Sequence, residues 1–162
     1  MADARDRRWQ EIGKAECFWL LAGHRLGRLA VVDDLGPVIF PVNYLLDRHM
    51  IVIRTSEGTK LQAAAGGRKV AFEVDGADEL TRTGWSVLVR GEATQVTGGA
   101  ELERLRSLPL IPWAPGDRTR YLRILPAAVT GRRILAPDGR QQRCRAGAQP
   151  TSSEQAPPWE RA

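Results

Sequence analysis

The sequence has few of the residues on which metal centres and disulfide frameworks depend. It contains 2 cysteines and 2 histidines among 162 residues. Cys17 and Cys144 lie far apart, one in a helical pattern and one in a polar tail, so they form neither a zinc motif nor a disulfide framework. No apolar run is long enough to span a membrane, and the charged start MADARDRRWQ lacks the apolar core of a signal peptide. We therefore expect a cytoplasmic protein with no metal site and no membrane partner.

Lysine is also scarce, although the chain carries a formal charge of +5. Only Lys14, Lys60 and Lys69 are lysines, and all the other basic residues are arginines. The arginines are scattered, with the densest groups near the two ends, and no helix-turn-helix pattern, zinc-finger spacing or RNA-binding aromatic motif accompanies them. This distribution is typical of a solvated basic surface, so we expect no nucleic-acid partner.

The remaining pattern predicts one mainly β domain with flanking helices. We expect a flexible N-terminus over residues 1–8, the domain over 9–136, and a disordered Pro-, Ser- and Gln-rich tail over 137–162. Apolar residues at helical spacing predict a helix over 9–22, and shorter helices are predicted over 57–65 and 99–108. Alternating apolar residues predict strands over 26–32, 38–46, 49–55, 68–75 and 85–96, and one that begins at 120.

Short connections between these strands indicate antiparallel hairpins. Six antiparallel strands favour a small barrel, because closing the sheet removes its exposed edges. Gly91 interrupts the strand over 85–96 and predicts a bulge or a close backbone approach.

The segment RTSEGTKL, which begins at Arg54, is the most chemically suggestive part of the chain. If Ser56 caps a helix, the free amides that follow it and the helix dipole attract an anion, and Thr55 adds a hydroxyl. Arg54 and Lys60 would add two cations. By itself the segment fits a capped helix with two solvated cations better than a phosphate site, and it lacks the P-loop spacing. Glu57 has no explanation here, and we expect its carboxylate to point away from any bound anion.

Five segments in order carry a resemblance to a known family: LGRLAVV, PVIFPVNYLLD, IVIRTSEGTKL, VAFEVD and GWSVLVRGEA. In this order, from about Ala15 to Ile134, the sequence resembles the pyridoxamine 5′-phosphate oxidase-like flavoproteins, and in particular their short bacterial branch. The resemblance implies a six-stranded antiparallel split β-barrel that forms a homodimer and binds FMN at the subunit interface.

The resemblance also implies which residues touch the flavin. The ring is expected against the backbone of Pro41, Val42, Asn43 and Tyr44 and against the strand end at Ile53, Arg54 and Thr55. The phosphate is expected on Arg54, Thr55 or Ser56, and Lys60. The partner subunit is expected to contribute Trp85, Ser86 and Trp113. No residue stands out as an acid, base or nucleophile, so no catalytic residue is predicted.

The implied function is an FMN-dependent oxidoreductase that transfers electrons between a nicotinamide or another small reductant and an unidentified small molecule. The alternatives are a deazaflavin-dependent reductase and a flavin-binding or flavin-sensing module without turnover. Some expected features of the wider family are missing. The region after Ala136 lacks the tryptophan and arginine found around the substrate in enzymes that oxidise pyridoxamine phosphate. Arg54 stands where relatives linked to nitroimidazole resistance have histidine, and His24 and His49 lie too early to match late haem ligands.

Overall fold

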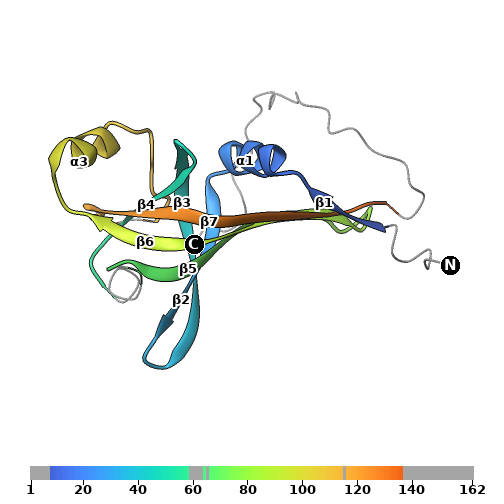
Figure 1. Cartoon of the computed structure of the whole chain (residues 1–162), viewed down its shortest axis with the longest axis horizontal. Helices are drawn as coiled ribbons and strands as arrows, with labels where there is room; N and C mark the ends of the chain where they lie inside the picture. Colours follow the sequence, from blue (N-terminus) through green and yellow to red (C-terminus); the bar gives the residue numbers. More distant parts are fainter. Residues whose placement is uncertain (1–7, 59–63, 65, 115, 137–162) are drawn as a thin grey trace, which may run out of the picture.

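The computed structural model describes residues 8–58, 64, 66–114 and 116–136 (Figure 1). The strands are β1 (Trp9–Ile12), β2 (Leu26–Asp33), β3 (Gly36–Asp47), β4 (Met50–Thr55), β5 (Arg68–Asp78), β6 (Thr83–Val96) and β7 (Arg120–Ile134). The two described helices are α1 (Lys14–Gly23) and α3 (Gly99–Arg106). Neither of them combines the length and apolar character that crossing a membrane requires.

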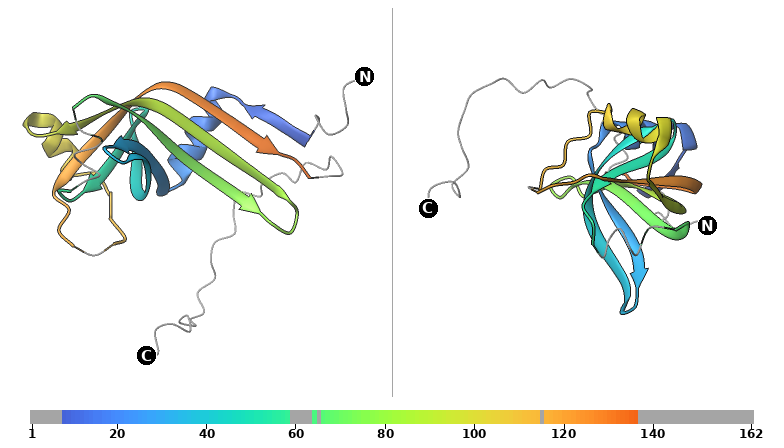
Figure 2. Two further views of the ribbon diagram at one scale, coloured as in Figure 1. Left: turned by 90° about the horizontal axis from the view of Figure 1, so that it is seen from below. Right: turned by 90° about the vertical axis from the view of Figure 1, so that its left-hand side faces the viewer.

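All seven strands belong to one antiparallel sheet in the order β1-β7-β4-β3-β2-β5-β6. Strand β7 also pairs with β6, so six of the strands form a closed circuit of pairings and β1 is added to the far end of β7. Figure 2 shows β6 and β7 side by side along most of their length. The β2–β3 hairpin projects away from the rest of the sheet (Figures 1 and 2).

The predicted mainly β, antiparallel architecture is confirmed, and the strands occur within a few residues of the predicted bounds. The helix predicted over 99–108 is α3. The helix predicted over 57–65 falls largely on residues 59–63 and 65, which lie outside the described residues. The tail predicted over 137–162 also lies outside them.

The predicted helix over 9–22 is wrong in its first part. Trp9–Ile12 is the strand β1, whose residues pair with β7 from Trp9↔Ile134 to Ile12↔Gly131. The reason is that β7 continues for 15 residues, and its last residues offer free backbone groups to the start of the chain. A further hydrogen bond from the Leu135 N–H to the Arg8 carbonyl (2.6 Å) extends this pairing.

The helix α1 packs one side against the core. Cys17, Leu20 and Leu21 are buried, whereas Trp19 is 67% exposed. Burial raises the pKa of the Cys17 thiol, with the nearby Glu16 carboxylate as a smaller cause.

The main core lies inside the closed circuit of strands and is centred on two aromatic rings. Tyr44 and Phe72 are fully buried and meet edge to face, with ring centroids 4.8 Å apart. The Tyr44 hydroxyl donates to the Leu21 carbonyl (2.7 Å), which joins β3 to α1, and burial raises the pKa of Tyr44 well above its ordinary value. A second cluster lies under α3 and includes Leu105 and Tyr121.

The predicted irregularity at Gly91 is confirmed. The pairing register between β6 and β7 shifts between Arg90 and Gly91. A Cβ atom on Gly91 would lie 2.1 Å from the Leu125 carbonyl oxygen, closer than any real contact. Only a residue without a side chain allows β6 and β7 to approach this closely.

We expect Gly91→Ala to lower the free energy of unfolding by about 1–3 kcal/mol, because the backbone of β7 must move to admit the methyl group. Chemical denaturation measures the change. Gly23→Ala is the matched control, since a Cβ there meets nothing within 4 Å, and it should leave stability unchanged or slightly higher. Equal stability of the two variants would show that the strands do not pack this closely at Gly91.

Candidate functional site

Two polar side chains lie where β3 and β4 stop pairing with each other. The last pair at this end is Tyr44↔Ile53, and the residues just beyond it are Asn43 on β3 and Arg54 on β4. From this point β3 continues along β2, with Asn43 opposite Leu26, while β4 continues along β7. Asn43 and Arg54 therefore both lie where the two strands separate.

The loop between α3 and β7 is attached to both side chains. The Asn43 Oδ1 accepts a hydrogen bond from the Trp113 N–H (2.8 Å), and the Arg54 Nε donates to the Arg118 carbonyl (2.5 Å). Asn43 also donates through Nδ2 to the Arg25 carbonyl (3.3 Å), just before β2. The Asn43 side chain thus connects β3 to the start of β2 and to the loop, and both its amide oxygen and its amide nitrogen are hydrogen-bonded.

Arg54 is held in place but keeps donors for a ligand. Its guanidinium lies over the Tyr121 ring, 5.9 Å from the centroid, and its side chain is half-buried. Among the described residues, its terminal nitrogens have no hydrogen-bond acceptor. The neighbouring Arg118 carries a buried Nε that also has no partner in the described part of the chain. The terminal donors of Arg54 are groups that a phosphate or carboxylate would satisfy.

The structure explains Glu57, which the sequence left without a role. Its carboxylate forms an ion pair with Arg120, the first residue of β7. Both side chains are exposed, so the pair contributes about 0–1 kcal/mol to stability. The pair also places a cation from β7 beside the negative charge that lies three residues after Arg54. That Glu57 points away from a bound anion stays a prediction.

The other predicted site residues differ in which of their groups a ligand could contact. Val42, Tyr44 and Ile53 are buried in the main core, so only their backbones could touch a ligand. Thr55 is buried, and Pro41 and Ser56 are exposed. Lys60 lies outside the described residues.

The structure joins Asn43 to Trp113 and Arg54 to the same loop, but it does not bring Trp85 and Ser86 to this place. Those two residues lie on β6, opposite Gly76 and Asp75 of β5. The Trp85 ring packs against His24, with centroids 4.8 Å apart, and no described contact joins it to Arg54. A role for Trp85 and Ser86 at this site would therefore require the partner subunit that the sequence predicted.

Three residues of this site were not predicted from the sequence: Arg118, Arg120 and Tyr121. The run DRTRYLR before the last strand was the available signal, since it concentrates arginines at a strand start. The signal could not be used, because the pairing Arg54↔Tyr121 joins residues far apart in the sequence.

Comparisons with known proteins agree with this architecture. The sequence model of the pyridoxamine 5′-phosphate oxidase family matches residues 13–133. An uncharacterized protein of Mycobacterium tuberculosis is 36% identical over 131 residues, which cover 78% of this chain and 86% of that one. The FAD binding protein from Mycobacterium smegmatis is 38% identical, covers 78% of this chain and 98% of its own, and superimposes with a TM-score of 0.68. A FAD-binding protein from Mesorhizobium loti, 24% identical with a TM-score of 0.65 over 77% of this chain and 96% of its own, shares the fold.

We expect Asn43→Ala to release the loop at Trp113, because the N–H of that residue loses its acceptor. A hydrogen bond of this kind contributes about 1 kcal/mol, so the Trp113 amide should exchange with solvent about fivefold faster. Hydrogen exchange followed by NMR measures this rate. Asn43→Asp keeps an oxygen acceptor and should preserve most of the protection. If both variants exchange like the wild type, the Asn43 side chain does not hold the loop.

Proposed function

This chain belongs to the pyridoxamine 5′-phosphate oxidase family, and from that premise we propose that it is a flavin-dependent oxidoreductase acting on a small molecule. The observation that carries the proposal is the arrangement at Arg54. A half-buried guanidinium is anchored through Nε to the loop, and no described residue accepts a hydrogen bond from its terminal nitrogens. These donors fit the phosphate of a flavin nucleotide.

The protein's part in this proposal is to bind and orient the flavin. Arg54, Thr55, Ser56 and Lys60 would hold the phosphate, and the backbone around Asn43 would lie along the ring. A bound flavin would supply the redox chemistry, taking electrons from a nicotinamide or another small reductant and passing them to the substrate. The Asn43 and Arg54 bonds to the loop keep the two binding strands in fixed positions, which orientation of a planar ring requires.

The flavin could be FMN or FAD, and each has support. The family resemblance of the sequence favours FMN. The described ligand of the Mycobacterium smegmatis relative favours FAD. The loop bonded to Asn43 also carries two exposed apolar side chains, Ile111 (75% exposed) and Trp113 (68% exposed). An adenine ring could stack on such a surface.

We further propose that the working unit is a homodimer, with the flavin at the subunit interface. Three apolar side chains of the projecting β2–β3 hairpin, Val32, Leu35 and Ile39, are 60–99% exposed. Apolar groups gathered on a projecting hairpin are typical of an association surface. In such a dimer Trp85 and Ser86 would reach the flavin of the partner subunit.

Replacing both phosphate-binding cations, Arg54→Ala with Lys60→Ala, should weaken flavin binding by about a hundredfold or more, because each charge-assisted hydrogen bond contributes about 1.5–3 kcal/mol. Titrations of FMN and of FAD, followed by flavin fluorescence, measure the affinity. Arg106→Ala is the matched control, since Arg106 pairs with Glu103 on the exposed side of α3. Unchanged affinity in the double variant would contradict the assignment of the phosphate to these residues.

The purified protein should be yellow, and mass spectrometry of the released cofactor should identify FMN or FAD. Adding NADPH or NADH should bleach the flavin absorbance, and a suitable acceptor should restore it. Bound flavin that no nicotinamide reduces would favour a flavin-sensing module without turnover. Preferential binding of a deazaflavin coenzyme would favour a deazaflavin-dependent reductase. A colourless protein with no affinity for any of these coenzymes would overturn the proposed function.

A further inference from the structure

A cavity of about 360 Å³ lies at the end of β4 that is remote from Arg54. Its wall is built from the first turns of α1, the β3–β4 turn and the middle of β7. Met50, the first residue of β4, lines it, whereas the flavin segment, RTSEGTKL, begins at Arg54 near the other end of the strand. Four residues of extended strand separate Met50 from Arg54 by about 13 Å. None of the residues that line the cavity belongs to the flavin segment.

The rim of this cavity carries positive charge that the described residues leave unbalanced. Lys14 and Arg48 line it, and neither takes part in an ion pair within the described part of the chain. No acidic residue belongs to the described lining. Helix α1 begins at Lys14 without a side-chain cap, so the positive end of its dipole adds to the potential.

The carboxylates closest in sequence to these cations are paired elsewhere. Asp47, next to Arg48, bonds to Arg104 of α3 (2.6 Å). Glu16, two residues after Lys14, bonds to Arg133 of β7 (2.7 Å). The acids nearest in sequence therefore do not neutralise the two cations that line the cavity.

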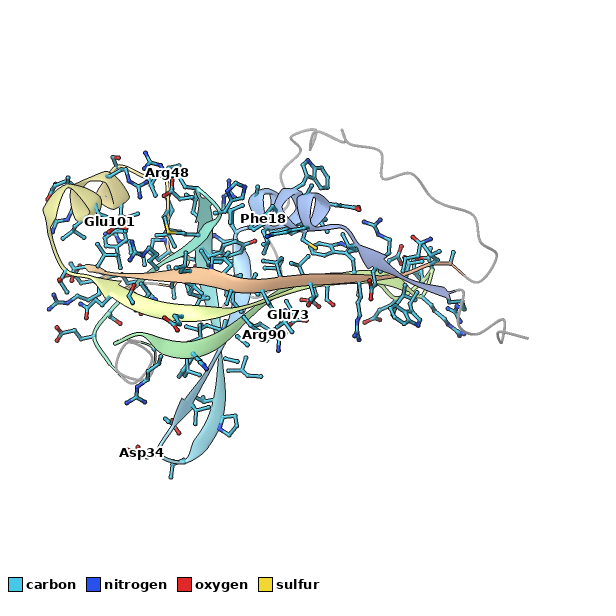
Figure 3. The ribbon with its side chains drawn as sticks, in the orientation of Figure 1. Phe18, Asp34, Arg48, Glu73, Arg90 and Glu101 are labelled. Carbon is cyan, nitrogen blue, oxygen red and sulfur yellow. The ribbon has the colours of Figure 1, made fainter. Side chains whose placement is uncertain are left out.

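The β3–β4 turn holds Arg48 in place at some conformational cost. Arg48 and His49 have φ angles of 48° and 66°, the left-handed region that two-residue hairpin turns require and that Asn-Gly usually supplies. Residues with long or ring side chains rarely adopt this region. The His49 ring meets the Phe18 ring edge to face, with centroids 4.6 Å apart, which fixes the turn against α1. Figure 3 shows Phe18 and Arg48 on the same side of β7.

The rest of the wall is apolar. Phe18, Met50, Leu125 and Pro126 line it, and Leu125 is 61% exposed although it is a large apolar side chain. The volume lies at the lower end of the range for small-molecule sites, ~300–1,000 Å³. A cationic rim over an apolar wall fits a small ligand that is negatively charged at one end and apolar over the rest.

We propose that this cavity binds a small aromatic monocarboxylate. The Arg48 guanidinium takes the carboxylate through two parallel hydrogen bonds, with Lys14 as a second cation. The planar body of the ligand lies against Phe18, Met50, Leu125 and Pro126. This site is separate from the flavin segment, so its occupation does not depend on the proposed redox function.

The test uses 4-fluorobenzoate as the probe and 19F NMR titration of the full-length protein. Binding should be saturable, and Arg48→Ala should weaken it at least about tenfold, because a charged hydrogen bond is lost. The neutral analogue 4-fluorobenzamide, of nearly the same shape, should bind at least about tenfold more weakly than the benzoate to the wild type. Leu125→Ala should weaken both probes alike, because it removes apolar contact only.

Arg106→Ala is the control for a general loss of positive charge and should bind the benzoate as the wild type does. Loss of benzoate binding in Arg54→Ala, with Arg48→Ala unaffected, would place the anion at the flavin segment and overturn the proposal. Equal affinity for benzoate and benzamide, or no saturable binding at all, would overturn it too. Failure of flavin binding in the same preparations would bear only on the proposed function.

Discussion

The structure depends on the backbone pairing of β7 with three other strands. This strand of 15 residues pairs with β4 over its first part, with β6 along most of its length and with β1 at its end. Backbone groups buried beside a core must be hydrogen-bonded, so each partner strand is held in place by β7. Its pairing with both β4 and β6 closes the circuit of strands around Tyr44 and Phe72. Gly91 permits that closure, because no side chain fits between β6 and the Leu125 carbonyl.

The candidate flavin site is a direct consequence of the β4–β7 pairing. That pairing places Arg54 opposite Tyr121 and brings the loop before β7 to Arg54 and Asn43. It also brings Arg120 close enough to Glu57 to form an ion pair. Three other arginines also form ion pairs with an acid on a different element: Arg104 with Asp47, Arg123 with Glu101 and Arg133 with Glu16. Some of the basic residues that looked scattered along the sequence therefore compensate acids on neighbouring elements.

The two proposed binding sites lie at opposite ends of β4 and differ in how their cations are supported. At the flavin end, Arg54 is anchored through Nε and rests over an aromatic ring, which leaves part of its fork for a ligand. At the other end, Arg48 projects from a strained turn that Phe18 holds through His49. Both ends rely on the rigidity of β4, whose central residues are fully buried. A ligand at one end could therefore be bound without rearranging the other.

The sequence by itself determined the positions of most strands, since side chains alternate along a strand, and it determined the irregularity at Gly91. It also singled out Asn43 and Arg54, each of which bonds to the loop before β7, although their role at a flavin site stays a prediction. It failed where the deciding partner is remote. Trp9–Ile12 carries a helical pattern but becomes a strand because the end of β7 is beside it, and Glu57 had no explanation until Arg120 was placed next to it. Local periodicity shows which side of a helix or strand is apolar. Only the tertiary structure decides which strand each segment pairs with and which charged group lies beside it, because those contacts join residues far apart in the chain.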